Sequence, residues 1–180
     1  MLKRFLILFC LVVLIIACQT TEIPKLTDVE HQEIADIIKQ KSQELLKLNA
    51  SFNEENFNKM MGYMVETDDV SWMGNPGVFV QGIKVIPTLE DLDTYFRPML
   101  GTRSSTNFTV IKDYISVMSE NHAVYVKEGK YSVTNLEGET GPEYPWTSTE
   151  VWLNKNGEWK ILHYHESWSD TPIKTEEDER

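Results

Sequence analysis

Apolar residues recur at helical spacing through the first third of the chain. A capping box at Thr27-Asp28-Val29-Glu30 opens this pattern, because the threonine oxygen and the glutamate each satisfy a backbone N–H at a helix start. The apolar positions that follow, mostly three or four residues apart, are Ile34, Ile37, Ile38, Leu45 and Leu48. This spacing predicts one long amphipathic helix that ends at about Leu48.

Two shorter helices are predicted after it. Ser51-Phe52-Asn53-Glu54 repeats the capping signal, and the apolar residues behind it are Phe57, Met60, Met61 and Met64. A third helix begins at Pro87-Thr88, with its apolar side formed by Leu89, Leu92, Tyr95, Phe96 and Met99. Because Pro98 interrupts this pattern, we expect the third helix to kink or end near Arg97.

From Thr106 onward the apolar period changes to two, which is typical of strands. Four strands are predicted at residues 108–118, 123–134, 146–153 and 158–168, and Asn156-Gly157 is a strong signal for a tight hairpin between the last two. Residues 68–74 predict a turn into a short strand, and residues 78–80 another. The sequence therefore predicts an α+β fold in which a curved, mostly antiparallel sheet wraps around three N-terminal helices.

Strict alternation along the final strand sorts its side chains into two sets. The residues expected on one face are Trp159, Ile161, His163 and His165, and those expected on the other are Lys160, Leu162, Tyr164, Glu166 and Trp168. Both sets contain large apolar groups, so we expect both faces of the sheet to be covered, one by the helices and one by a partner subunit.

The N-terminus has the features of an export signal. A basic start is followed by an uncharged apolar run from residue 5 to residue 17, which is shorter than a membrane-spanning helix needs. The run ends in Ile15-Ile16-Ala17-Cys18, which resembles the lipobox of bacterial lipoproteins, where the cysteine is lipidated and becomes the new N-terminus. The expected organisation is a signal peptide at 1–17, a lipidated tether at 18–26, a domain at 27–170 and an acidic tail at 171–180, held at a membrane of the bacterial cell envelope and facing the periplasm or the exterior.

Charge and cysteine content narrow the classes of function. The chain has 17 Lys and Arg against 28 Asp and Glu, a formal net charge of −11, which argues against a nucleic-acid partner. Once Cys10 leaves with the signal and Cys18 carries the lipid, the exported domain has no thiol for a disulfide, a nucleophile or a metal ligand. The sequence also contains no glycine-rich phosphate loop, and we expect no cofactor.

Three stretches carry a family resemblance. They are Asp68-Asp69-Val70-Ser71-Trp72-Met73-Gly74, then Gly82-Ile83, and the closing strand Asn156-Gly157-Glu158-Trp159-Lys160-Ile161-Leu162-His163-Tyr164-His165-Glu166-Ser167. Their order and spacing resemble the nuclear transport factor 2-like superfamily, which includes SnoaL-like proteins and the kinase association domain. The resemblance implies a cone-shaped fold, a pocket lined by the inner sheet face, and a homodimer formed through the outer face. It implies no particular reaction.

The resemblance also places residues in the pocket. In the kinase association domain the positions of Glu150 and Glu166 carry pocket arginines, so an anion site would become a carboxylate site suited to a cation, an amine or another hydrogen-bond donor. Two buried carboxylates would push one pKa upward. Alternatively, both glutamates are exposed or paired with Lys160 or Arg97. The aromatic residues expected to line the pocket, or else to belong to an ordinary core, are Trp72, Tyr95, Tyr131, Trp152 and Tyr164.

His163 and His165 are secondary candidates for the site. Both would lie on one face of the last strand, as two metal-binding imidazoles could. A third ligand would have to come from His122, Asp69 or a glutamate, and zinc sites are usually more closed than that. We therefore predict no metal.

The sequence supports three functions. The leading hypothesis is a lipid-anchored domain that binds a small molecule without catalysis, because no nucleophile–base pair is recognisable. The second is a cyclase, dehydratase or isomerase with Glu150 or Glu166 as general acid–base and Tyr95 or Tyr164 as donor. The third is a structural dimerisation module with an apolar outer sheet face and no cavity. The sequence does not identify the ligand, decide whether the protein is an enzyme, or say which membrane leaflet carries the anchor.

Overall fold

The computed structural model describes residues 25–65, 71–75, 84–86 and 88–174. The long helix predicted from the capping box is α2 (Asp28–Ala50), and both halves of the box are formed. The Thr27 side chain accepts from the Glu30 amide at 3.3 Å, and the Glu30 carboxylate accepts from the Thr27 amide at 2.7 Å. The buried stripe of α2 consists of Ile38, Ser42 and Leu45.

The two shorter helices form near their predicted positions, although Asn53 and not Ser51 caps the first of them, because Ser51 ends α2. Helix α3 (Glu54–Met61) begins after Asn53, whose side chain accepts from the Asn56 amide at 2.9 Å. Helix α4 (Leu89–Phe96) begins after Thr88 and continues as the short 3₁₀ helix η2 (Arg97–Met99), with Pro98 inside it. As predicted, the α-helix ends near Arg97, because proline has no N–H to donate to the preceding turn.

The strands form one six-stranded sheet. They are β1 (Ser71–Asn75), β2 (Lys84–Ile86), β3 (Ser105–Ser119), β4 (His122–Thr134), β5 (Tyr144–Lys155) and β6 (Glu158–Trp168), in the spatial order β2-β1-β6-β5-β4-β3. The four long strands pair antiparallel as predicted, and β1 pairs parallel with β6. The periodicity did not predict β2, and the strand expected at residues 78–80 lies outside the described residues. The predicted α+β cone fold is confirmed.

The hairpin between β5 and β6 has the predicted turn. Asn156 and Gly157 both adopt positive φ, 58° and 86°. A two-residue turn of this kind matches the right-handed twist of the flanking strands. It fixes the start of the β5–β6 register, in which Lys155 faces Glu158.

Strict alternation is wrong for β6, because a bulge interrupts it. Trp152 pairs with Ile161, and the preceding residue of β5, Val151, pairs with His163. Leu162 therefore has no partner in β5. An extra residue reverses the side-chain parity beyond it. Trp159 and Ile161 are therefore buried on the same side as Tyr164 and Glu166.

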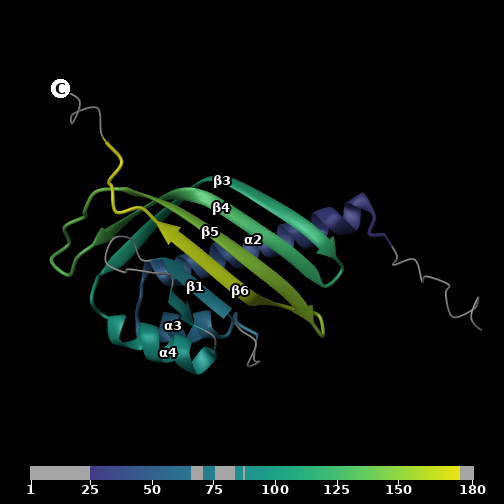
Figure 1. Ribbon diagram of the computed structural model, residues 1–180, viewed down its shortest axis with the longest axis horizontal. Coiled ribbons are helices and arrows are strands. Elements are labelled where there is room, and N and C mark those ends of the chain that lie inside the picture. Colours follow the sequence, from purple (N-terminus) through teal and green to yellow (C-terminus); the bar gives the residue numbers. More distant parts are fainter. Residues whose placement is uncertain (1–24, 66–70, 76–83, 87, 175–180) are drawn as a thin grey trace, which may run out of the picture.

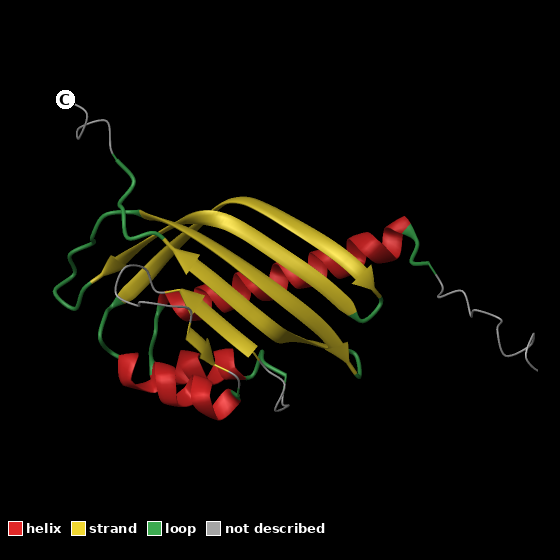
Figure 2. Ribbon diagram, viewed as in Figure 1, coloured by secondary structure: helices red, strands yellow, loops and turns green. Residues whose placement is uncertain are grey.

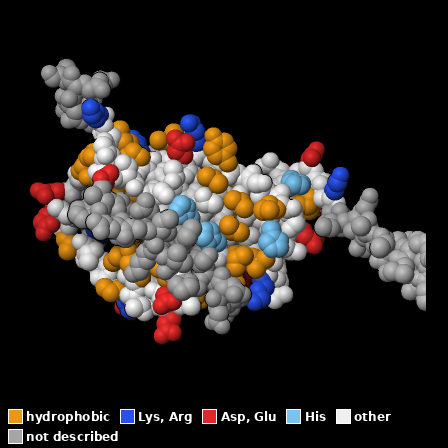
Figure 3. Space-filling view, viewed as in Figure 1, with side chains coloured by type: hydrophobic (Ala, Val, Ile, Leu, Met, Phe, Trp, Pro, Cys, Tyr) orange, Lys and Arg blue, Asp and Glu red, His pale blue; other side chains and the backbone are white. Residues whose placement is uncertain are grey.

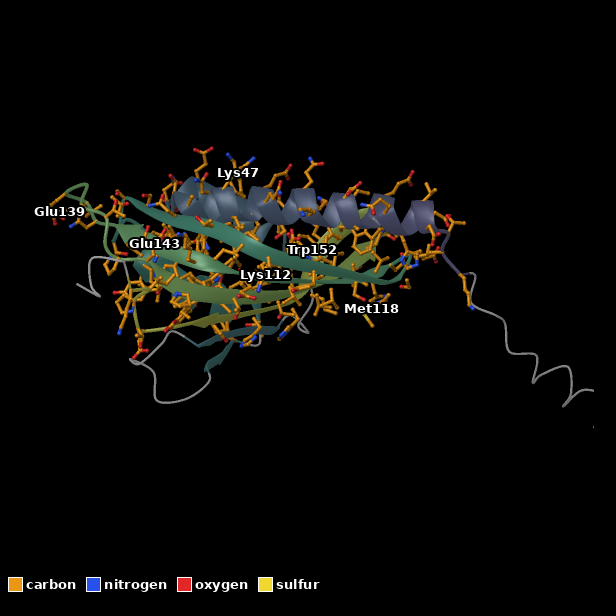
Figure 4. All side chains as sticks on the ribbon, turned by 90° about the horizontal axis from the view of Figure 1, so that it is seen from above. Lys47, Lys112, Met118, Glu139, Glu143 and Trp152 are labelled. Atoms are coloured by element: carbon orange, nitrogen blue, oxygen red, sulfur yellow. The ribbon has the colours of Figure 1, made fainter. Side chains whose placement is uncertain are left out.

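The helices cover one face of the sheet. Helix α2 lies behind β3 and β4, and α3 and α4 lie together beneath the sheet in the same view (Figures 1 and 2). Seen from above, α2 lies on one side of the sheet, with Lys47 on its outer surface and Met118 on the sheet's opposite side (Figure 4). The face turned toward the helices is called the inner face below, and the other the outer face. Among the described residues, no helix is long and apolar enough to cross a membrane.

Candidate functional site

A cavity of about 150 Å³ lies between the two short helices and the inner face of the sheet. The helical side of its wall is apolar and includes Phe57, Met60, Leu92, Tyr95 and Phe96. The sheet side includes Thr106, Phe108, Tyr131, Glu166 and Trp168. A mostly apolar cavity with a few polar groups is the usual form of a small-molecule site.

Glu166 is a buried acid on the wall of this cavity. Glu166 is only 3% exposed, and the Tyr164 hydroxyl donates a hydrogen bond to its Oε1 at 2.7 Å. Burial raises the pKa of Glu166, although the hydrogen bond from Tyr164 and the nearby charge of Lys127 act in the opposite direction. Glu166 can therefore bind a hydrogen-bond donor as a carboxylate, or donate a hydrogen bond itself when protonated.

Glu150 is also buried, but a cation neutralises it. The Lys127 ammonium pairs with Glu150 Oε1 and donates to Ser42 Oγ at 2.7 Å, while Ser42 donates to the same carboxylate oxygen at 3.0 Å. Trp152 Nε1 donates to the other oxygen at 2.9 Å. The aromatic rings of Tyr125 and Trp146 each lie 5.4 Å from the ammonium. This buried polar cluster joins α2 to β4 and β5.

Arg103 and Thr106 add two polar groups to the cavity wall. The guanidinium of Arg103 lies 5.1 Å from the centre of the Phe52 ring, as in a cation–π contact. Burial lowers the pKa of Arg103, and the charge of Glu166 acts against that shift. Arginine stays protonated in proteins, so the cavity carries a permanent positive charge. Arg103 Nε and Thr106 Oγ1 are buried atoms without a hydrogen-bond partner.

The structure divides the residues expected in the pocket into two groups. Tyr95, Tyr131 and Glu166 line the cavity. Glu150, Trp152 and Tyr164 are buried, but they are not among the described residues that line it.

The side chain of Trp72 and the whole of the expected lipid anchor lie outside the part of the chain that the structure describes. Trp72 lies in β1 with its backbone opposite Tyr164 and Ile86, and its side chain is not described. Asp69, Cys18 and the segment 1–17, expected to be a signal peptide, lie outside the described residues.

The expected alternative partners of the glutamates are engaged elsewhere. Arg97 pairs with Asp93, and Lys160 pairs with Glu158 at 3.1 Å and donates to the Gly62 carbonyl at 2.6 Å. The alternative in which the two glutamates are exposed is also wrong, because both are buried. The raised pKa of Glu166 is caused first by burial, and the charge of Glu150 is the smallest contribution.

The strand histidines lie on the outer face, away from the cavity wall. His163 pairs with Val151 and His165 with Thr149, and both histidines are half-buried. His165 Nε2 is 3.4 Å from Ser167 Oγ. Within the part of the chain that the structure describes, no group of three His, Cys, Asp or Glu side chains could hold a metal ion.

With the cavity and its buried charges established, comparison with known proteins gives the family. Residues 30–170 match the family model of the calcium/calmodulin dependent protein kinase II association domain. The chain belongs to this family. A comparison of this chain with curated protein sequences found no match.

Solved structures share the fold of this association domain. The association domain of C. elegans CaMKII is 19% identical with a TM-score of 0.57, over 78% of this chain and 99% of that one. A nuclear transport factor 2-like superfamily protein from Salmonella enterica is 18% identical with a TM-score of 0.56, over 83% and 96%. A hexachlorocyclohexane dehydrochlorinase from Novosphingobium barchaimii is 13% identical with a TM-score of 0.56, over 82% and 94%. At these low sequence identities, the TM-scores show a common fold and nothing about a shared function.

The sequence analysis did not single out Lys127, Ser42 or Arg103, which form the polar sites of this association domain. Lys127 could have been found, because it lies in β4 at one of the alternate, inward-facing positions, between Tyr125 and Gly129. Ser42 could also have been found, because it lies on the helical stripe between Ile38 and Leu45. Arg103 precedes β3 in a loop, where no periodicity indicates which way a side chain points.

Proposed function

We propose that this association domain binds a small, largely apolar molecule in the cavity beside Glu166, without converting it chemically. The observation that carries the proposal is a buried acid on the wall of a mostly apolar cavity. Such an acid gives orientation to a ligand whose binding energy comes from the surrounding Met and aromatic side chains. The second buried carboxylate, Glu150, is neutralised by Lys127, which leaves Glu166 as the acid available to a ligand.

Calorimetric titration with benzylamine and phenol tests the proposal. Both probes combine a ring with one hydrogen-bond donor, and we expect each to bind with one molecule per chain. Met99→Trp should abolish this binding, because Met99 lines the cavity and the larger side chain would fill it. Met118→Trp is the matched control, since Met118 is 69% exposed on β3 (Figure 4). Absence of binding by the unmodified domain, or equal binding by both variants, contradicts the proposal.

A second candidate is an enzyme of the same fold. The raised pKa of Glu166 beside Tyr164 favours it, because a general acid–base needs a pKa near the working pH. The structural neighbours include a dehydrochlorinase, which shares only the fold. The version that uses both glutamates in one cavity has no support, since Glu150 is paired with Lys127. Turnover of a bound molecule that Glu166→Gln stops, with binding retained, would establish the enzyme.

We also propose a homodimer formed through the outer face of the sheet. Membership of an association-domain family supports self-association. Val124, Val126, Val151, His163 and His165 are half-buried and lie together on the outer face by strand pairing; they are called the outer-face patch here. Hydrophobic and histidine side chains gather on this face in Figure 3. A purely structural dimerisation module was expected to have no cavity, and the cavity argues for binding in addition.

The membrane anchor is a proposal from the sequence. A basic start, a short apolar run and Ala17-Cys18 support lipidation of Cys18 and attachment to a membrane of the bacterial envelope. Expression in a bacterium with a labelled fatty acid tests this. The label should appear in the chain and should be lost in Cys18→Ser, together with recovery in the membrane fraction.

A further inference from the structure

His163 and His165 lie two residues apart on the outer face of β6. His163 is opposite Val151 and His165 is opposite Thr149, and both histidines are half-buried. Alternate residues of a strand lie about 6.6 Å apart on the same face, so two imidazoles at this spacing can converge on one metal ion. Imidazole nitrogen is a good ligand for zinc and related divalent transition metals. One chain therefore presents half of a four-coordinate site on this face.

The other half of such a site has to come from outside the chain. Among the residues that the structure describes, no group of three His, Cys, Asp or Glu side chains could hold a metal ion, so nothing described completes the histidine pair. A second copy related by a two-fold axis would add the same two imidazoles, because a two-fold interface uses the same surface on both subunits. The site is then incomplete in one chain and complete in a homodimer.

The strand pairing sets the histidines among apolar side chains. Val151 and Val124 continue the row of His163 across β5 and β4, and Val126 stands in the row of His165. Burying an imidazole nitrogen against a valine of the partner would cost the hydrogen bond that the nitrogen makes with water. Setting β6 against β6 of the partner avoids this cost, since the four imidazoles then share one cation.

The geometry of packed sheets allows this arrangement. Strand β6 lies inside the sheet between β1 and β5, so an axis near it leaves strands on both sides to pack against the partner. Two packed sheets lie about 10 Å apart, and imidazoles from both can meet midway between them.

Two further features favour a bound cation. His165 Nε2 can donate to Ser167 Oγ at 3.4 Å, and a metal-binding histidine usually donates its second ring N–H to a polar group. Each chain also carries a formal net charge of −11, so a divalent cation between two copies offsets part of their repulsion.

We propose that the homodimer binds one divalent transition-metal ion, zinc or a close analogue, through His163 and His165 of each subunit. The ion lies on the two-fold axis between the outer faces, and the cavity beside Glu166 has no part in this site. Self-association is then strengthened by the metal. The inference rests on the proposed homodimer, since only two copies complete the site.

Zinc alone, added to the protein after treatment with EDTA, tests the site. Calorimetry at about pH 7.5, where imidazole is mostly neutral, should give one Zn²⁺ per two chains. Sedimentation equilibrium gives the dissociation constant of the dimer with EDTA and with Zn²⁺. At a free Zn²⁺ concentration about tenfold above its own dissociation constant, mass action should tighten the dimer about tenfold.

Variants assign the site to its residues. His163→Ala and His165→Ala should each weaken Zn²⁺ binding about tenfold or more and remove the effect of Zn²⁺ on self-association. His31→Ala is the matched control, because His31 is exposed on α2. Co²⁺ reports the geometry of the unmodified site, since four imidazoles should give the intense visible absorption of tetrahedral Co²⁺.

The outcomes separate the metal site from the homodimer. If the protein is dimeric in EDTA and Zn²⁺ neither binds nor tightens the dimer, the metal site is wrong and the homodimer remains. One Zn²⁺ bound to each monomer, or a Zn²⁺ effect that both histidine variants keep, also contradicts the metal site. A protein that is monomeric with and without Zn²⁺ refutes both. Tightening by one Zn²⁺ per two chains that each histidine variant loses and His31→Ala keeps supports the inference.

Discussion

Lys127 on β4 and Glu150 on β5 form an ion pair that is almost completely shielded from water, with side chains 1% and 0% exposed. Ser42 of α2 bonds to both partners, so the pair also holds the long helix against the sheet. Taking two charges out of water is costly, and a buried pair tolerates the loss of neither partner. The pair is therefore a structural element beside the cavity.

Breaking this pair should destabilise the domain more than removing it. Glu150→Gln leaves the Lys127 ammonium buried without a counter-charge. Lys127→Met leaves the Glu150 carboxylate buried without one. Each should lower the free energy of unfolding by about 3–5 kcal/mol. The double variant Lys127→Met/Glu150→Gln should be more stable than either single variant. Urea unfolding measures all four chains, and additive losses in the double variant would contradict a coupled pair.

The stability contributed by Glu166 should decrease as pH rises. Its pKa is raised by burial, so the folded state holds a proton that the unfolded state, with a pKa near 4.5, releases first. Stability is therefore fully present below the unfolded pKa and is lost progressively from about pH 4.5 up to the folded pKa. Glu166→Gln removes this pH dependence of the free energy of unfolding. The stability of the variant relative to the unmodified domain should therefore improve between pH 4 and pH 8.

Urea unfolding at several pH values checks this prediction. Glu143→Gln is the control, because Glu143 lies in an exposed ion pair with Lys130. A stability difference between the Glu166→Gln variant and the unmodified domain that stays constant with pH would be inconsistent with a raised pKa in the folded state.

Gly157→Ala should destabilise the closing hairpin. Gly157 has a φ of 86°, a conformation in which a side chain meets the neighbouring carbonyl oxygen. We expect a loss of about 1–2 kcal/mol in the free energy of unfolding. Gly141→Ala is the matched control, since the added methyl group there meets only an ordinary contact at 3.6 Å. Equal losses in both variants would mean that the turn conformation is not the cause.

Val151→Lys should separate the proposed homodimer. Val151 lies opposite both Val124 and His163 in the outer-face patch, where a lysine would have to be desolvated on association. Light scattering after gel filtration should give a monomer for this variant and a dimer for the unmodified domain. Thr147→Lys, at an exposed position on the same face of β5, should remain dimeric. A monomeric unmodified domain would refute the dimer.

The local pattern of the sequence was sufficient for most of the secondary structure. The caps at Thr27, Asn53 and Thr88 begin helices, and Asn156-Gly157 forms the expected turn. These features depend on a few neighbouring residues, so they can be read without knowing the rest of the fold. For the same reason the four long strands and the α+β class were predictable.

The site depended on which segments meet in space. A single unpaired residue, Leu162, reversed the parity of β6 and brought Trp159 to the side of Glu166, which no count of alternating residues could foresee. Lys127 and Ser42 reach Glu150 from positions 23 and 108 residues away in the chain.

By itself, then, the sequence determined the helices, the four long strands and the closing turn, because hydrogen bonding and side-chain period act over a few residues. It left open whether Glu150 and Glu166 are buried or exposed. Tertiary structure alone decided that Lys127 neutralises one glutamate while Arg103 and Thr106 share a cavity with the other. Burial and electrostatic pairing depend on distance in space, and the folded sheet, not the chain order, sets those distances.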